Sequence, residues 1–219
     1  MNVLQIDVSV NVGSTGRIAE QIGQKILENN GKSTIAFGRY EAASMSEKIK
    51  IGTRWEQAHH LIITRIFDKH GLGSVSGTKT LIKKIKKLNP DIIHLHQIHG
   101  YYVNIEILFG FLAIYGKPVI WTLHDCWAYT GHCCHYVRVG CKKWETGCFS
   151  CPLKGYYPQS LYIDNSKENY VLKKQLFTSI PYLTLVPVSN LSLIHISKTW
   201  PEIEFVSSDE LSDIMKKNI

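Results

Sequence analysis

Apolar runs of strand length alternate along this chain with segments whose apolar residues recur at helical spacing, and no other feature restricts the fold as strongly. The strand-like runs cover residues 2–9, 32–38, 49–52, 91–96, 117–125 and 182–189. The helical segments cover residues 15–28, 53–71, 80–90, 105–116 and 163–177. This alternation predicts right-handed βαβ units and therefore an α/β fold, a Rossmann-like open parallel sheet with helices on both faces.

The segment 53–71 is predicted to be a helix that ends at Gly71. Trp55, Ile62 and Ile66 recur at helical spacing within it and therefore share one face. The helix is thus expected to be amphipathic, with these three residues on its apolar side.

Four of the lysines behind the net charge of +7 lie in the segment 80–90. Lys83, Lys84, Lys86 and Lys87 fall opposite an apolar stripe and so occupy the wet face of the predicted helix. They form either a merely solvated face or a surface that attracts an anionic membrane or a phosphate-bearing substrate. No sequence signature of RNA or DNA binding accompanies them, so nucleic acid is not an expected partner.

Ligands of open parallel sheets collect outside the carboxyl ends of the strands, so the residues that follow each strand-like run are candidates for function. After the first run, Gly13 and Gly16 allow tight turns, and the helix N-terminus that follows offers free amides to an anion. The stretch is neither a Walker loop nor a dinucleotide-binding fingerprint, and a plain turn explains the two glycines equally well.

Histidines stand at the ends of two later strands. His94 and His96 alternate onto one face of the run 91–96, and His99 follows; buried packing residues and a polar site both explain this pattern. The run 117–125 ends in His124 and Asp125, where the carboxylate could fix the tautomer of the imidazole or bind a hydroxyl group. No Gly-x-Ser-x-Gly nucleophile elbow is present, which disfavours a serine hydrolase.

All six cysteines lie between Cys126 and Cys151. Their spacing contains one Cys-x2-Cys knuckle, a common half of a zinc site, while reduced thiols or two disulfides remain alternatives. His132 and His135 are substitute ligands. A metal in this glycine-rich loop, which we expect to have little core of its own, would be structural, and no catalytic metal is expected. The ligand set that the spacing favours is Cys133, Cys141, Cys148 and Cys151.

The N-terminus lacks the basic leader of a signal peptide, and no stretch of eighteen uninterrupted apolar residues is present. The protein is therefore expected to be cytoplasmic, where cysteine clusters are more often metal ligands than disulfides. The lysine-bearing helix leaves peripheral contact with the inner face of the cell membrane as an option.

Five motifs follow one another along the chain: VNVGSTGRIA, NPDIIHLHQIHGYYVN, WTLHDCWAYTGHC, VGCKKWETGCFSCP and PVSN. Together they resemble the N-terminal domain of bacterial glycosyltransferases of family 4, in the subgroup that builds cell-surface polysaccharides such as capsule and colanic-acid-type polymers. The resemblance runs from about Asn2 to Asn190.

What the resemblance implies is a GT-B enzyme with two Rossmann-like domains that face a cleft. The N-terminal domain would hold a saccharide or lipid-linked acceptor, and the C-terminal domain would hold a nucleotide-sugar donor. Members of the family transfer a hexose with retention of configuration and generally without a metal in the reaction.

The resemblance also assigns roles to residues. Gly13, Gly16 and Arg17 would face the donor phosphates, and His124 would lie against the transferred sugar with Asp125 beside it. The acceptor side would be lined by His96 and His99. The cysteines Cys133, Cys141, Cys148 and Cys151 would act as one unit, while Cys134 would be incidental.

Residues 1–190 are thus expected to form the acceptor-side domain, and residues 191–219 a tail that does not match the family. The donor domain is expected to be absent from this chain, which alone should transfer little or no sugar because half of the groups that stabilise the leaving diphosphate would be lacking. Two alternatives are a zinc-stabilised binding module without catalysis and a metal-dependent hydrolase that uses the histidines.

Overall fold

One parallel sheet organises the part of the chain that the computed structural model describes, residues 1–188 and 203–206. Within that part the sheet has seven strands in the order β3-β2-β1-β4-β5-β6-β7, and every neighbouring pair is parallel. The strands are β1 (Asn2–Val10), β2 (Lys32–Glu41), β3 (Glu47–Lys50), β4 (Ile92–Leu95), β5 (Val119–Leu123), β6 (Leu183–Pro187) and β7 (Glu204–Phe205).

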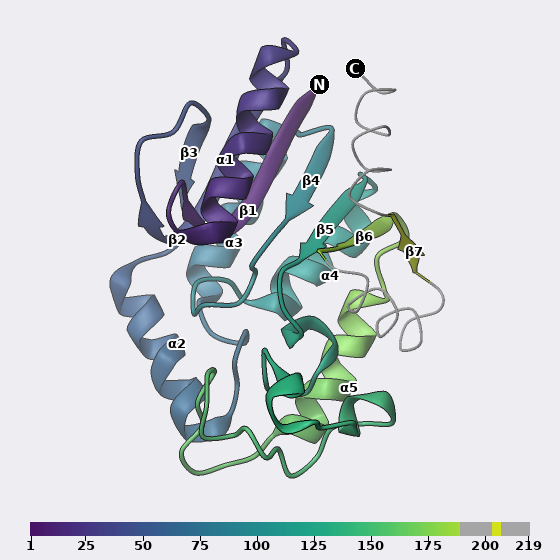
Figure 1. The fold of residues 1–219 in the computed structure, drawn as a ribbon. Coiled ribbons are helices and arrows are strands. Elements are labelled where there is room, and N and C mark those ends of the chain that lie inside the picture. Colours follow the sequence, from purple (N-terminus) through teal and green to yellow (C-terminus); the bar gives the residue numbers. More distant parts are fainter. Residues whose placement is uncertain (189–202, 207–219) are drawn as a thin grey trace.

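Helices cover both faces of the sheet, which confirms the predicted α/β class. Figure 1 shows α1 in front of the sheet and α3 and α4 behind it, while α2 lies beyond the lower ends of the strands. The α-helices are α1 (Gly13–Glu28), α2 (Arg54–Phe67), α3 (Val75–Leu88), α4 (Ile105–Tyr115) and α5 (Ser166–Phe177).

The central strands are apolar because helices bury them on both sides. Every residue of β5 is buried, and Ile93 and Leu95 of β4 are fully inaccessible. Behind the sheet, the rings of Phe109, Trp121 and Phe177 pack with centroids 4.4–5.5 Å apart. This packing fixes the strands whose ends carry the predicted histidines.

Helix α2 begins as its sequence suggests but ends earlier than predicted. The side chains of Thr53 and Glu56 form a reciprocal capping box at its start. The helix stops at Phe67, because Asp68 adopts a left-handed conformation with φ of 52°, and not at Gly71. Asp68 therefore ends the helix, which places its carboxylate among the loops that follow.

The apolar face of α2 points away from the protein. Trp55 is 86% exposed and Ile62 is 54% exposed, whereas His60 and Thr64 on the opposite face are buried. The amphipathic pattern is thus real, but its polar side packs inward, because His60 bonds to Ser74 (3.0 Å) and to the Gly71 N–H (3.0 Å).

Between β5 and α5 the chain forms only three short 3-10 helices, η1 (Trp127–Tyr129), η2 (Tyr136–Val139) and η3 (Lys143–Glu145). The expectation that this cysteine-rich segment has little core of its own is wrong. The rings of Tyr129, Tyr136 and Trp144 pack with centroids 5.1–6.2 Å apart, and all three are buried. These three aromatic side chains form a small core of the segment, which its glycine content did not suggest.

Of the predicted tail, 191–219, the structure describes only residues 203–206. Within them, Glu204–Phe205 pair with β6 as the last strand of the sheet. The remainder of the tail lies outside the described residues.

Candidate functional site at the carboxyl ends of the strands

From β1, the chain adds β2 and β3 on one side of the sheet and β4 to β7 on the other, so the topological switch point lies between β1 and β4. The predicted site residues follow β1, β4 and β5, at and beside this point. The backbone N–H of Gln97, after β4, donates to Asp7 Oδ1 (3.2 Å) near the end of β1. Thr15, at the start of α1, donates to Gln97 Oε1 (3.5 Å). The glycine-bearing loop and the histidine segment are therefore in contact.

A chain of hydrogen bonds connects the buried sheet to His124. Gln5 Oε1 lies 3.0 Å from His96 Nε2, and His96 Nδ1 lies 3.3 Å from His124 Nε2. The indole N–H of Trp121 donates to the His96 carbonyl (2.9 Å) and holds that segment against the core. His96 itself is only 1% exposed, so it positions His124 and cannot reach a ligand directly in this arrangement.

The direction of these bonds follows from the amide of Gln5. Its Nε2 donates to the carbonyl of Ala19 (2.8 Å), so its Oε1 is left to accept from His96 Nε2–H. Neutral His96 then offers an unprotonated Nδ1, which accepts from His124 Nε2–H. The remaining nitrogen of neutral His124, Nδ1, is consequently a hydrogen-bond acceptor.

Burial keeps these imidazoles neutral. It lowers the pKa of His94 to about 3 and that of His96 well below the usual range. His94 also pairs with Thr122 (2.8 Å), and its ring centroid lies 4.2 Å from that of His96 with the rings tilted by 30°, which confirms that the two share one face. Burial likewise lowers the pKa of His124, although nearby Asp125 opposes the shift.

His99 and Asp125 form a second pair beside this chain of bonds. His99 Nε2 lies 2.7 Å from Asp125 Oδ2, and His99 Nδ1 lies 3.2 Å from the hydroxyl of Tyr157. Burial opposes ionisation of Asp125, but its interactions with His99 and the Trp127 N–H outweigh burial and hold its pKa below the usual range. Asp125 is therefore an anion, and its carboxylate orients the ring of His99.

The four residues predicted here, His96, His99, His124 and Asp125, line one cavity of about 10 Å³, large enough for about one water molecule. His124 is the most exposed of the three histidines. It is thus the imidazole best placed to meet a ligand that enters at this edge.

Asp7, near the end of β1, belongs to the same edge and was not among the predicted site residues. Burial raises its pKa to about 6, against the opposing effect of the N–H groups of Val8 and Gln97. A carboxylate inside an apolar run at the end of the first strand was the signal that could have identified it.

The predicted phosphate loop divides into exposed and packed parts. Gly13 (φ of 70°) and Arg17 are exposed at the start of α1, whose first turn contains no acidic residue. Gly16 is buried, and a Cβ there would lie 2.6 Å from Ser9 Oγ. Gly13 and Arg17 can therefore face an anion, while Gly16 permits close packing of α1 against β1.

The cysteines separate into two groups. Cys133, Cys141, Cys148 and Cys151 all line a second cavity of about 10 Å³, together with His132 and Trp144. Burial raises the pKa of Cys148, and the interaction with Cys133 followed by burial raises that of Cys151. A bound cation would act in the opposite direction and favour the thiolates. The four residues fit a structural zinc ion by number and type.

Cys134 lies apart from these four, beside the His99–Asp125 pair. Among the described residues, the set of three potential metal ligands whose atoms lie within 4.8 Å of one another is His99, Asp125 and Cys134. His99 and Asp125 are already joined by their own hydrogen bond there. Among the four predicted cysteine ligands, no three sulfur atoms in the described structure lie within 4.8 Å of one another.

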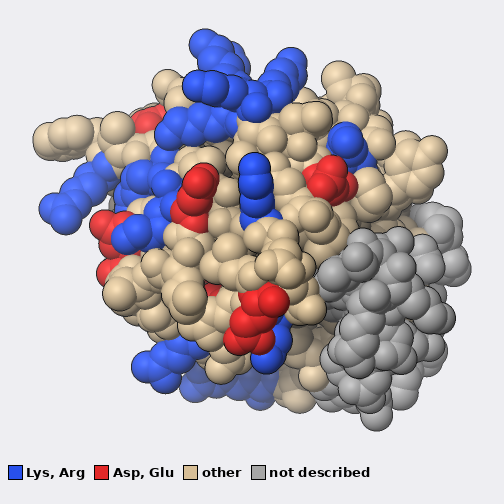
Figure 2. Space-filling view, turned by 90° about the horizontal axis from the view of Figure 1, so that it is seen from above, with Lys and Arg blue, Asp and Glu red and all other residues tan. Residues whose placement is uncertain are grey.

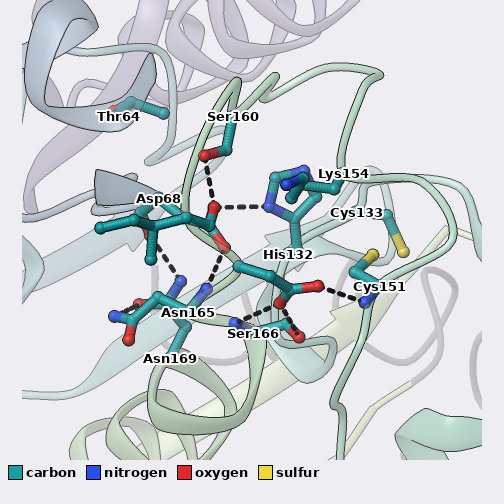
Figure 3. A network of polar contacts seen from close by, with 12 residues as sticks. Thr64, Asp68, His132, Cys133, Cys151, Lys154, Ser160, Asn165, Ser166 and Asn169 are labelled. Carbon is teal, nitrogen blue, oxygen red and sulfur yellow. Dashed lines mark hydrogen bonds and ion pairs between the residues drawn. The ribbon is translucent and has the colours of Figure 1, made fainter. Parts of the chain in front are cut away.

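A buried polar network attaches the cysteine segment to α2 and α5 (Figure 3). Asp68 Oδ1 lies 2.5 Å from His132 Nδ1, and Asp68 Oδ2 accepts from the Asn165 N–H (2.9 Å). Asp164 accepts from the Cys151 N–H (2.5 Å) and the Ser166 N–H (3.0 Å). These hydrogen bonds therefore hold the cysteine segment at two places, His132 and Cys151 of the Cys-x2-Cys knuckle.

No protein-family model matches the chain. A search of curated proteins finds "Putative colanic acid biosynthesis glycosyl transferase WcaC" of Escherichia coli (strain K12), 28% identical over 189 residues. The alignment covers 81% of this chain and 45% of that protein, so the chain spans just under half of its relative's length. The similarity supports a glycosyltransferase and gives no support to a binding module without catalysis.

Proposed function

We propose that this chain is the acceptor-side half of a retaining GT-B glycosyltransferase of family 4 that acts in the synthesis of a surface polysaccharide. It would receive a hexose from a nucleotide-sugar held by a donor domain and pass it to a saccharide or lipid-linked acceptor. The observation that carries the proposal is the hydrogen-bonded chain Gln5–His96–His124 at the sheet's switch point, in a chain similar to a glycosyl transferase.

In this proposal, different residues at this edge contact different parts of the substrates. His124 would accept a hydrogen bond from a hydroxyl of the transferred sugar through Nδ1, because His96 holds its other nitrogen. The exposed amides near Gly13, together with Arg17, would face the donor diphosphate at the N-terminus of α1. His99, oriented by Asp125, would lie on the acceptor side.

We further propose that Cys133, Cys141, Cys148 and Cys151 hold one structural zinc ion. Zinc bound there would pin the segment between β5 and α5, which supplies Asp125 and the buried ring of Trp127 near the site. No step of the transfer passes through this metal.

Cys148→Ser is expected to reduce bound zinc from about one ion per chain to near zero and to lower the free energy of unfolding by at least about 2 kcal/mol. Cys134→Ser is the matched control, because Cys134 does not line the four-cysteine cavity. Metal content by mass spectrometry and urea unfolding measure both effects. Equal zinc loss in the two variants would refute the four-ligand set.

The function itself is tested by joining this chain to a GT-B donor domain and measuring transfer of a labelled hexose from nucleotide-sugars to membrane-extracted acceptors. Labelled, anomerically retained product supports the proposal. Labelled hydrolysis product without transfer, or no turnover with any nucleotide-sugar, contradicts it.

A further inference from the structure

Helix α2 presents its apolar side to solvent, with Trp55 and Ile62 more than half exposed. An amphipathic helix in a globular domain ordinarily buries that side, whereas this one buries His60 and Thr64. An apolar helix face left open to solvent, unlike single exposed apolar residues, is a candidate site of interaction.

The loop before α5 enlarges the surface. The N–H of Leu161 donates to the carbonyl of Arg65 (2.8 Å), which fastens this loop to the last turn of α2. Figure 1 shows the two segments side by side at the lower end of the molecule. We call the combined surface the α2 patch; its exposed apolar members are Trp55, Ile62, Phe67, Leu161, Tyr162 and Ile163.

A groove joins the α2 patch to α3. It has a volume of about 380 Å³ and lies between Trp55, His59 and Ile63 of α2 and Val75 at the start of α3. Trp55 forms part of its wall, so the groove and the patch are one surface. The groove's volume is sufficient to admit apolar side chains or a segment of a lipid chain.

Positive charge is concentrated on these same two helices. Residues 53–89 contain eight lysines and arginines and two acids, a net of +6 out of the whole chain's +7. This net already subtracts both acids: Glu56, which also lines the groove, accepts from the N–H groups of Thr53 and Gly77, and Asp68 is buried against His132. The cations are Arg54, Arg65, Lys69, Lys79, Lys83, Lys84, Lys86 and Lys87.

Three of these lysines continue from the groove along α3. Val75, Lys79, Lys83 and Lys87 recur every four residues, so they follow one side of the helix, and all four are exposed. Figure 2, seen from above, shows a group of basic side chains at the top of the view, the side on which α3 lies. Acidic side chains in that view are scattered.

We propose that the α2 patch, the groove and this lysine row together dock the protein on an anionic lipid bilayer. Tryptophan and aliphatic side chains flanked by lysine and arginine are the composition of surfaces that lie in a membrane interface. A nucleic acid would account for the lysines but not for exposed Trp55 and Ile62, and a second copy of a surface this basic would repel the first. No helix in the described part of the chain is long and apolar enough to cross a bilayer, so the contact is peripheral.

The docking surface is argued from its own residues; only its use, bringing a lipid-linked acceptor to the strand ends, rests on the proposed function. The test is flotation of the purified 219-residue chain with vesicles of phosphatidylcholine alone or with phosphatidylglycerol. We expect binding to the anionic vesicles, with much weaker binding to the neutral ones.

Two variants and their controls test the surface. The triple change Lys79→Gln, Lys83→Gln and Lys87→Gln is expected to weaken partition about a hundredfold, at about a fivefold loss per lysine. The control Lys32→Gln, Lys142→Gln and Lys174→Gln removes the same charge from exposed positions outside the α2 patch and α3 and should change partition by less than about threefold. Trp55→Ser should weaken it about tenfold or more, and Ile114→Ser, equally exposed on α4, should not.

Three results would overturn the proposal: no binding of the parent chain to anionic vesicles, equal losses in the paired variants, or self-association in sedimentation that Trp55→Ser abolishes. Binding to RNA that is as strong as binding to anionic vesicles and insensitive to Trp55→Ser would do the same. Because no sugar donor is present, these outcomes are independent of whether the chain supports glycosyl transfer.

Discussion

Replacing Asp68 by alanine is expected to lower the free energy of unfolding by about 3–5 kcal/mol, because it leaves buried His132 without its charged partner. Both side chains are fully inaccessible, and their contact of 2.5 Å joins the end of α2 to the cysteine segment (Figure 3). The same carboxylate accepts from the Asn165 N–H at 2.9 Å, which would also be left unpaired. Urea unfolding of the parent and variant chains measures the loss.

The control for this prediction is Asp91→Ala. Asp91 also accepts a backbone N–H, that of Asn2 at 2.7 Å, but it lies in an exposed setting. Its removal should cost less than about 1 kcal/mol. A loss for Asp68→Ala no greater than that for Asp91→Ala would show that the buried network does not hold the loop.

Asp68→Asn provides a second readout through pH. Burial opposes protonation of His132, but the hydrogen bond and charge of Asp68 outweigh burial and raise the pKa of His132 above its usual value. Because the pKa of His132 is higher in the folded than in the unfolded chain, its protonation stabilises the fold. This stabilisation is complete at pH values below the unfolded pKa of about 6.5 and is lost as pH rises through the folded pKa. The difference in stability between the parent and Asp68→Asn should therefore shrink as pH rises from 6 toward 9.

The fold could be predicted from the sequence because each central strand is an apolar run bounded by a helical segment. Parallel strands buried on both faces leave this signal directly in the chain, as in 91–96 and 117–125. The orientation of α2 could not be predicted in the same way. Its apolar stripe is clear in the sequence, but which side packs inward depends on His60, whose partners Ser74 and Gly71 lie in the following loop.

The arrangement of the candidate site was predicted in part. The rule that ligands meet the carboxyl ends of parallel strands brought His96, His99, His124 and Asp125 to one place, and the structure brings these four around one cavity. Which of them is accessible could not be predicted, because the orientation of buried His96 depends on a hydrogen bond to Gln5, 91 residues away in sequence. Asp7 was missed because a carboxylate in a strand matches no motif: its place inside an apolar run was the signal in the sequence, and its contact with Gln97 arises only in the fold.

The cysteine segment shows the same division. Spacing singled out four thiols, and the structure gathers those four around one cavity while Cys134 lies elsewhere. The aromatic core formed by Tyr129, Tyr136 and Trp144 was not foreseen, because glycines between them suggested an open loop. Aromatic side chains spaced irregularly in a loop pack together through turns that periodicity does not reveal.

His124→Ala is expected to reduce sugar transfer by about 10²–10³-fold in a protein that joins this chain to a GT-B donor domain. The loss follows from removing a preorganised acceptor whose tautomer the buried chain Gln5–His96 fixes. His124 is half-buried, so the substitution should leave the fold intact. Gln5→Leu should cause a smaller loss in kcat, because it frees the tautomer of His124 without removing the imidazole.

The most direct test of the site is kcat for hexose transfer by His124→Ala, measured beside its urea-unfolding curve. We predict a fall in kcat of at least a hundredfold with an unfolding free energy within about 1 kcal/mol of the parent. The control is Tyr182→Ala, an exposed residue that directly precedes β6 at the opposite, amino end of the strands, which should transfer sugar at the parent rate. Transfer by His124→Ala at the parent rate would contradict the assignment of the strand ends as the place where the sugar is held.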